Sequence, residues 1–320
     1  MTGHIVVTRS LTAAAMEDAA RLPGELVVLG EAPPERRALL AAVPDASAIL
    51  SQLTERIDDE VLAAAGPSLR IVANGAAGVD NVDIPAAARR GVLVTNTPDV
   101  LDDATADLTL ALILATTRRV VEADRFIRGG SAWTWGPREW LGLQLSAGAT
   151  LGIVGLGRIG IAVARRARAF GARIVASGSR ATSAEAAALG VEAVTLDQLF
   201  ARAEVVTLHC PLTPETAGLV DSSRLASMRR GSYLINTGRG RLVDEEALAD
   251  ALDSGHLAGA GLDVHEHEPC VNARLRNSDR VVLLPHIGSA GAATRDAMGR
   301  LAVRNVAEVL AGRDPLTPVA

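Results

Sequence analysis

The sequence predicts an α/β protein with two domains, each built on a parallel β-sheet. Three observations predict this class. Short β-branched runs alternate with Ala-, Leu- and Arg-rich helical stretches along the whole chain. The 320 residues are enough for two domains of ordinary size. A glycine-rich turn near mid-chain follows an apolar strand and precedes a helix, which is typical of a nucleotide-binding βαβ unit.

The first hundred residues predict the smaller domain. Apolar periodicity between the strand candidates predicts helices such as Pro34–Val43 and Ile57–Ala65. Five strand–helix units suffice for a small flavodoxin-like domain. The strand candidates are Ile5–Thr8, Leu26–Leu29, Ala48–Ser51, Arg70–Ala73 and Leu93–Thr95.

The larger domain is expected to begin with a long apolar helix, Asp102–Gly129, which has acidic residues at its start and glycine at its end. Six strand candidates then fit one doubly wound, Rossmann-like cofactor domain. The last helix, about Ala292–Ala311, has no partner there, so we expect it to pack on the N-terminal domain. The predicted organisation is a discontinuous substrate domain, residues 1–98 plus 290–320, around a cofactor domain, residues 99–289. The six strands are Leu151–Val154, Arg173–Ala176, Val205–Leu208, Tyr233–Asn236, Gly261–Val264 and Val281–Leu284.

Composition and charge exclude several classes of function. The net charge is −5, so no nucleic-acid-binding surface is expected. The chain has no lysine, which excludes Schiff-base chemistry and leaves its one tyrosine, Tyr233, without a lysine for a Tyr/Lys reductase pair. Cys210 and Cys270 are too few for a disulfide framework and are expected to be reduced. The longest apolar stretch, Leu108–Ala115, is far shorter than the ~20 residues of a membrane span. With no signal-peptide pattern, a soluble cytoplasmic protein is expected.

The glycine-rich turn predicts a dinucleotide site. Gly155 permits the tight turn after the strand, Gly157 lets the backbone approach a pyrophosphate, and Gly160 allows close packing of helix on strand. The helix that begins near Arg158 offers free N–H groups and a positive dipole end to the phosphates.

The end of the next strand predicts which dinucleotide binds. Enzymes that use NAD place an acidic residue about 20 residues past the fingerprint, on the ribose 2′-hydroxyl. Here Arg180 lies 180 − 160 = 20 residues past Gly160, and no carboxylate occurs before Glu185. Ser179 and Arg180 can donate charge-assisted hydrogen bonds, each worth ~1.5–3 kcal/mol, to a 2′-phosphate. We therefore expect NADP(H) rather than NAD(H), the alternative being that Arg180 is a solvated surface arginine.

Three motifs at predicted strand ends carry candidate catalytic residues. Arg239 lies between two glycines, where its guanidinium can bind a substrate carboxylate bidentately and polarise a carbonyl. His286 follows a strand and is suited to donate a proton, because histidine titrates near neutral pH. Glu268 is the expected carboxylate beside it, and such a partner favours the imidazolium. Together these residues predict reduction of a 2-keto acid by hydride transfer. His4, His256, His265 and His267 are expected to be structural or solvated, and no metal site is expected.

These motifs resemble the D-isomer-specific 2-hydroxyacid dehydrogenase family, and within it the glyoxylate/hydroxypyruvate reductases. The resemblance covers nearly the whole chain, and it implies two Rossmann-like domains, with the cofactor domain inserted into the substrate domain, in a homodimer. The matching segments are Val72–Asn81, Asn96–Pro98, Asp103–Asp107, the Gly155–Gly160 fingerprint, His209–Thr216, Asn236–Gly240, Leu262–Pro269 and Pro285–Ser289.

The resemblance also implies individual roles. Backbone N–H groups of Ala76, Ala77 and Gly78 would hold the substrate carboxylate, with Ser289 in the same pocket. Asp263 would bind the nicotinamide carboxamide. Trp140, in the Trp133–Trp140 segment, would restrict the substrate from across the dimer, unless these tryptophans only fill the interface. The implied cofactor contacts are Thr105, Gly155, Leu156, Gly157, Arg158, Ile159, Gly160, Ser179, Arg180, Cys210, Pro211, Thr216, Thr237, Gly238, Arg239, Asp263, His286 and Gly288.

Two departures leave the substrate open. Ala77 stands where these reductases often carry a bulkier residue, which predicts a roomier pocket, and the stretch Cys270–Asp279 is unusual. The alternatives are another D-2-hydroxyacid dehydrogenase on the same scaffold and a dinucleotide-sensing protein like the corepressors that share this fold. Glu268 counts against a formate dehydrogenase, which lacks that partner.

Overall fold

The computed structural model describes residues 3–319, and the chain divides into two compact units. Unit 1 comprises residues 1–101 and 289–320, and unit 2 comprises residues 102–288. Both are α/β units with parallel sheets, which confirms the predicted fold class. Among the described residues, no helix is long and apolar enough to span a membrane.

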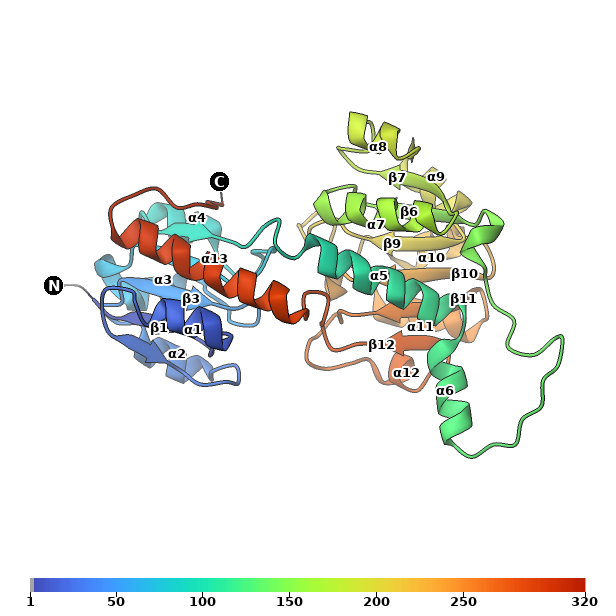
Figure 1. Ribbon diagram of the computed structural model, residues 1–320, viewed down its shortest axis with the longest axis horizontal. Helices are drawn as coiled ribbons and strands as arrows, with labels where there is room; N and C mark the ends of the chain where they lie inside the picture. Colours follow the sequence, from blue (N-terminus) through green and yellow to red (C-terminus); the bar gives the residue numbers. More distant parts are fainter. Residues whose placement is uncertain (1–2, 320) are drawn as a thin grey trace. The chain divides into compact units, whose positions relative to one another are not determined.

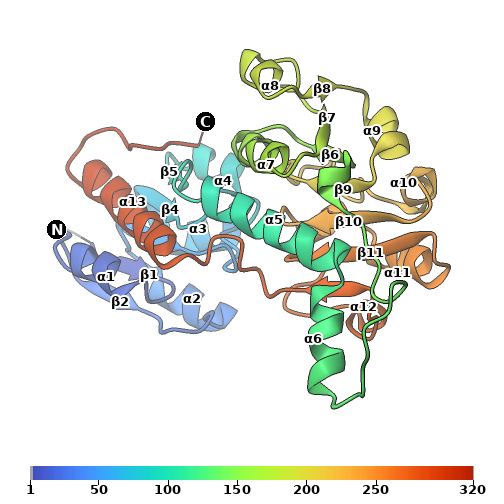
Figure 2. The same cartoon turned by 45° about the vertical axis from the view of Figure 1, so that its right-hand side comes forward.

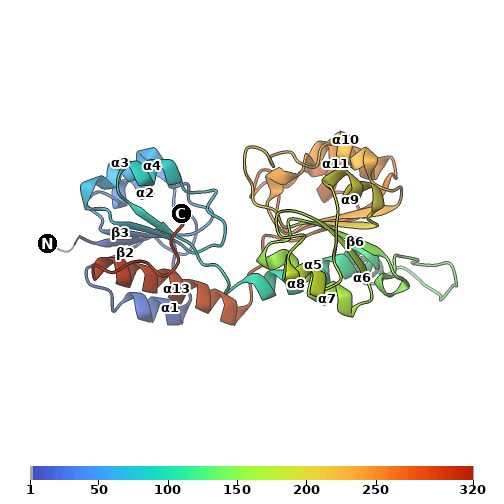
Figure 3. The same ribbon diagram turned by 90° about the horizontal axis from the view of Figure 1, so that it is seen from above.

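Unit 1 contains a five-stranded parallel sheet in the order β2-β1-β3-β4-β5, which is the flavodoxin-like order. Helices α2, α3 and α4 cover one face, and α1 and α13 cover the other (Figure 3). The strands are β1 (Ile5–Val7), β2 (Leu26–Val28), β3 (Ala48–Ser51), β4 (Ile71–Asn74) and β5 (Leu93–Thr95). The helices are α1 (Ala13–Ala19), α2 (Arg36–Ala42), α3 (Asp59–Ala65), α4 (Ile84–Arg89), the 3₁₀ turn η1 (Gly66–Ser68) and α13 (Ala292–Leu310).

The last helix, α13, belongs to unit 1 although it is remote in sequence from the rest of that unit. It lies along the face of the sheet beside α1 (Figure 1). Val303, Val306 and Val309 of α13 pack in one core cluster with Ile5 and Leu50 of the central strands. Since α13 buries its apolar stripe on this sheet, the unit is made from two separate stretches of chain.

Unit 2 contains a seven-stranded parallel sheet in the order β12-β11-β10-β9-β6-β7-β8. Counted from β6, the order is 3-2-1-4-5-6 with a seventh strand added, which is that of a doubly wound dinucleotide fold. The ligand-binding crevice of such sheets lies outside the carboxyl ends of the strands, where the order reverses between β6 and β9. The strands are β6 (Thr150–Val154), β7 (Arg173–Ser177), β8 (Glu192–Ala193), β9 (Val205–Leu208), β10 (Ser232–Asn236), β11 (Leu257–Leu262) and β12 (Val281–Leu283).

Helices cover both faces of this second sheet (Figure 3). Leu112 and Ile113 of α5 pack with Ile161 of α7 in the core under one face. Phe200 of α9, Leu225 of α10 and other buried residues fill the core under the opposite face. The helices are α5 (Asp102–Thr117), α6 (Val120–Arg128), α7 (Arg158–Ala169), α8 (Ala184–Ala188), α9 (Leu196–Arg202), α10 (Ser222–Ser227), α11 (Glu245–Asp253) and α12 (Ala273–Arg276), with 3₁₀ turns η2 (Leu145–Ala147) and η3 (Gly240–Leu242).

The single long helix expected over residues 102–129 is wrong. The chain breaks into α5 and α6 at Arg119, which adopts a left-handed conformation with φ 54°. The guanidinium of Arg119 pairs with Glu122 and lies 4.8 Å from the centre of the Trp140 ring. The N–H of Leu143 donates to the carbonyl of Thr117 at 3.0 Å. Contacts with a later segment therefore end α5, and no glycine or proline at the break signals it.

Two strands also differ from the prediction. The sequence analysis missed β8, a two-residue strand at the sheet edge beside β7 (Figure 2). Strand β11 begins at Leu257 and ends at Leu262, whereas it was expected over residues 261–264. Its first four residues are Leu257-Ala-Gly-Ala, and their small size hid the strand.

Candidate active site

The glycine turn between β6 and α7 has the packing that a dinucleotide fingerprint requires. Gly155 has φ +88°, and a Cβ there would lie 2.5 Å from the backbone nitrogen of Cys210. A Cβ on Gly160 would lie 2.4 Å from the carbonyl oxygen of Gly155. By contrast, a Cβ on Gly157 would meet nothing within 4 Å. Thus two glycines serve chain packing, whereas Gly157 leaves open space at the N-terminus of α7, where a pyrophosphate fits.

Strand β7 ends at Ser177, without a carboxylate, and the loop after it is exposed. Arg180 pairs with Glu185 at 3.0 Å, and Arg165 reaches the same carboxylate at 3.5 Å. The side chains of Arg180 and Glu185 are 46% and 43% exposed. Two guanidinium groups therefore share one carboxylate at this edge, so the three groups together carry a net positive charge. Such a site suits a 2′-phosphate better than a 2′-hydroxyl.

Several other predicted cofactor residues follow strand ends of unit 2. The hydroxyl of Thr216 donates to the carbonyl of Pro211 at 2.7 Å, which closes the loop after β9. Burial raises the pKa of the half-buried Cys210 thiol in the same loop. The hydroxyl of Thr237, after β10, lies 2.8 Å from that of Thr109 on α5. Thr105, one turn earlier on α5, is buried against Gly288.

His286 and Glu268 form a direct pair at the ends of β12 and β11. The Nδ1 atom of His286 lies 2.9 Å from Oε2 of Glu268, and the side chains are 24% and 31% exposed. Burial by itself raises the pKa of Glu268, but the hydrogen bond and charge of His286 outweigh it. The net direction is downward, so Glu268 stays ionised beside His286 to lower pH than an ordinary glutamate does.

Asp263 fixes the turn that carries His286. Its two carboxylate oxygens accept the N–H groups of Ile287 at 2.8 Å and of Gly288 at 2.7 Å, and its carbonyl accepts that of His286 at 2.8 Å. These bonds hold His286 in a left-handed conformation, φ 57°, which few non-glycine residues adopt. Asp263 is fully buried, and burial raises its pKa. In this structure Asp263 therefore holds the turn. Because its carboxylate is fully buried, a bound carboxamide could contact it only if the turn opened.

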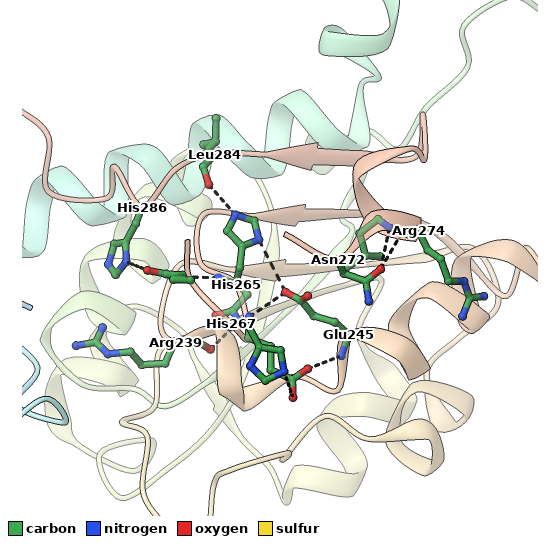
Figure 4. A network of polar contacts seen from close by, with 12 residues as sticks. Arg239, Glu245, His265, His267, Asn272, Arg274, Leu284 and His286 are labelled. Atoms are coloured by element: carbon green, nitrogen blue, oxygen red, sulfur yellow. Dashed lines mark hydrogen bonds and ion pairs between the residues drawn. The ribbon is translucent and has the colours of Figure 1, made fainter. Parts of the chain in front are cut away.

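Arg239 lies on the loop between β10 and η3. Its carbonyl accepts the side-chain amide of Asn236 at 2.8 Å, and its Nη1 donates to the carbonyl of Gly238 at 2.9 Å. Figure 4 shows the Arg239 guanidinium and the His286 imidazole at the same side of the network, both directed away from the sheet. Unit 2 thus brings a guanidinium, a carboxylate and an imidazole to one edge.

His265, which was expected to be structural or solvated, is buried and has a structural role, but its partners were not predicted. It is 7% exposed, and its backbone N–H donates to Oε1 of Glu268 at 3.0 Å. Its ring lies between Glu245 and the carbonyl of Leu284 (Figure 4). The only signal in the sequence is the three-residue spacing between His265 and Glu268, which is typical of a local turn and does not reveal the more remote partners.

The remaining predicted substrate residues belong to unit 1 or to the segment after α6. The Ala76–Gly78 loop and Ser289 belong to unit 1. In that loop the carbonyl of Ala77 accepts the side chain of Asn96 at 2.7 Å, and the carbonyl of Gly78 accepts that of Asn74 at 2.9 Å. Trp140 packs edge-on against Phe126 of α6, with ring centres 5.2 Å apart. It is therefore held at the break between α5 and α6 by Phe126 and Arg119.

The chain is similar in sequence and in structure to several known dehydrogenases and reductases. The sequence profile of the D-isomer specific 2-hydroxyacid dehydrogenase NAD binding domain matches residues 110–288. The chain is 50% identical to a glyoxylate reductase of Thermococcus kodakarensis over 290 residues, which cover 89% of this chain and 86% of that protein. A glyoxylate reductase from Paecilomyes thermophila has a similar structure, with TM-score 0.88, 33% identity, and coverage of 99% and 98% of the two chains. An NADPH-dependent glyoxylate/hydroxypyruvate reductase from Sinorhizobium meliloti, solved with NADP and malonate, gives TM-score 0.86, 37% identity, and coverage of 100% and 97%.

Proposed function

Since the chain belongs to the D-isomer specific 2-hydroxyacid dehydrogenase family, we propose that it is an NADP(H)-dependent reductase of small 2-keto acids, with glyoxylate and hydroxypyruvate as substrates. The observation that carries the proposal is the Glu268–His286 pair, 2.9 Å apart, at the strand ends of the unit that holds the glycine fingerprint. Unit 2 then binds the cofactor, and unit 1 contributes to substrate binding.

The residues of unit 2 divide the chemistry among them. When bound, the nicotinamide cofactor supplies a hydride to the keto carbon. Arg239 binds the substrate carboxylate and polarises the carbonyl oxygen, on which negative charge develops. Because Nδ1 of His286 is held by Glu268, Nε2 is the atom that gives its proton to the new alkoxide. Glu268 stabilises the imidazolium before the transfer and orients the ring throughout.

Cofactor preference follows from the exposed edge after β7. Ser179 and Arg180 would hold a 2′-phosphate, in competition with Glu185, which already binds Arg180. The S. meliloti reductase was solved with NADP and supports this assignment by similarity. On the substrate side, the backbone N–H groups of Ala76, Ala77 and Gly78 and the side chain of Ser289 are assigned by family membership alone.

We infer a homodimer from the surface around α6. Val120 and Ile127 of α6 are 53% and 51% exposed, and Trp133, Trp135 and Leu141 after it are 68%, 80% and 68% exposed. So many large apolar side chains in one segment mark a surface that another chain covers. Trp140 lies in the same segment, so the assembled dimer is where its role in the substrate site has to be tested.

The test is a panel of two cofactors and three keto acids, followed by NADPH or NADH absorbance. We expect turnover of glyoxylate and hydroxypyruvate, less turnover of pyruvate, and a larger kcat/KM for NADPH than for NADH. Equal or greater kcat/KM for NADH would refute the cofactor assignment. Tight NADPH binding without turnover of any 2-keto acid would instead favour a dinucleotide sensor, the rival interpretation of the same fold. Analytical ultracentrifugation tests the dimer.

A further inference from the structure

His265 contacts each of the three segments that carry the proposed catalytic residues. Its backbone N–H donates to Oε1 of Glu268 at 3.0 Å. Its ring Nε2 lies 3.0 Å from the carbonyl oxygen of Leu284, two residues before His286. A Cβ on Gly240, next to Arg239, would lie 1.9 Å from the carbonyl carbon and oxygen of His265, so the two backbones are in direct contact.

The partners of the ring fix its tautomer. A carbonyl oxygen can only accept, so Nε2 must carry a hydrogen and donate it to Leu284. Nδ1 then faces Oε1 of Glu245 at 3.8 Å, and no atom of the described residues hydrogen-bonds to it. These two side chains are 5% and 6% exposed. If Nδ1 also carried a proton, the ring would form a buried ion pair with the Glu245 carboxylate.

Glu245 is itself fixed by the loop that it faces. It is the first residue of α11, and its Oε1 accepts the N–H of Glu266 at 3.0 Å. The ring of His265 thus spans from α11 to the end of β12 (Figure 4). The charged groups near Glu268 are His286, His265 and Asp263, which lie on the same loop and on the turn after β12.

We propose that His265 is a positioning residue of the reduction, which holds the segments of Arg239, Glu268 and His286 in register through its ring and its backbone. Only the kinetic measurements that test this role depend on the proposed function. The ring acts on His286 through the Leu284 carbonyl, and on Glu268 by fixing the His265 backbone N–H, whose hydrogen bond lowers the pKa of the Glu268 carboxyl. A ring that only filled space would not move the pH dependence of the pair.

The test compares His265→Phe with His265→Gln and His267→Phe. Phenylalanine keeps the aromatic bulk and loses both polar contacts, whereas the glutamine amide can still donate to Leu284. His267 is the matched control, because it lies on the same loop with its side chain 80% exposed.

We expect His265→Phe to lower kcat about tenfold, since small displacements of catalytic groups are costly, while KM changes less than twofold. The acid limb of the kcat profile should move to higher pH, because a displaced His265 backbone weakens the N–H hydrogen bond that lowers the pKa of Glu268. His265→Gln should recover most of kcat, and His267→Phe should behave as wild type.

Nuclear magnetic resonance of the ring nitrogens in ¹⁵N-histidine-labelled protein separates this proposal from the proposed function. The wild type should show the signal of a buried histidine with its proton on Nε2, and this signal should be absent in His265→Phe. The acid titration sensed at the His286 ring should move to higher pH in that variant. These results would support the positioning role even if no keto acid were reduced. A His265→Phe protein with native kcat, or one with lowered kcat and melting temperature but unmoved acid limb and His286 signals, would overturn it.

Discussion

Unit 2 presents two functional edges that are built differently. At the end of β7, Arg180 and Glu185 meet in an exposed ion pair, which solvent screens. Beyond the ends of β11 and β12, the side chains of Glu268 and His286 are less exposed, at 31% and 24%, and are backed by the buried His265 and Asp263. The difference indicates that groups whose position matters are held by backbone hydrogen bonds. The groups that we propose to select the cofactor are instead partly exposed side chains that form an ion pair. Substitutions at the two edges should therefore differ in size and in kind.

The largest effect is expected from His286→Ala. It removes the only proton donor assigned to the alkoxide, so kcat for keto-acid reduction should fall by about 10²- to 10⁴-fold. Cofactor affinity, followed by NADPH fluorescence titration, should fall far less than kcat. If kcat stayed within a few-fold of wild type, the proton would come from another group, and the Glu268–His286 pair would lose its assigned role.

The glycine turn allows a matched pair of substitutions. Gly160→Ala places a Cβ 2.4 Å from the carbonyl of Gly155, whereas Gly157→Ala meets no protein atom within 4 Å. We expect Gly160→Ala to lower the melting temperature by several degrees, as overpacking of about 1–3 kcal/mol does. Gly157→Ala should melt as wild type yet bind NADPH at least tenfold more weakly, because its methyl fills the phosphate space. Normal NADPH binding by Gly157→Ala would place the pyrophosphate elsewhere.

Glu268→Gln should act mainly on pH dependence, with kcat lowered by about tenfold at neutral pH. Without the carboxylate, the imidazolium of His286 is less favoured, so the alkaline limb of the reductive profile should move to lower pH. On the acid side, the pKa of Glu268 is lower in the folded protein than in the unfolded chain. Its ionised form therefore contributes its full stabilisation above the ordinary glutamate pKa, and this stabilisation is lost as the pH falls through the lowered pKa of the folded state. Urea unfolding between pH 3 and pH 7 should therefore show a flatter dependence in the variant. Unchanged profiles in both measurements would contradict the pairing.

The smallest effect is expected from Arg180→Ala. The ratio of kcat/KM for NADPH to that for NADH should fall by about tenfold. This lies at the low end of the effect of losing a charge-assisted hydrogen bond, because Glu185 competes for the guanidinium. Arg202→Ala is the control, since Arg202 forms a similarly exposed pair with Glu192 near the same sheet edge. A ratio equally lowered by both substitutions would indicate a general charge effect, and a ratio lowered by neither would leave Arg180 as a surface residue.

The same contrast explains what could be predicted from the sequence. Strands such as Ala48–Ser51 and Val205–Leu208 are uniformly buried, so short, mostly apolar runs mark them correctly. The strands before Arg239 and His286 are marked in the same way, whereas the strand before Glu268, β11, was misplaced because of its small residues. The break at Arg119 was missed because distant contacts with Trp140 and Leu143 impose it. The partners of His265 could not be predicted for the same reason, since two of them, Glu245 and Leu284, are 20 and 19 residues away.

The contact between Gly240 and His265 bears on attempts to redesign this enzyme. Any side chain at position 240 would collide with the neighbouring main chain, 1.9 Å from an ideal Cβ. Directed-evolution libraries that randomise the whole Asn236–Gly240 loop would therefore consist mostly of misfolded clones. Diversity is better introduced at Ala77 of unit 1, with residues 239 and 240 held constant, so that selection screens for new substrates among folded proteins.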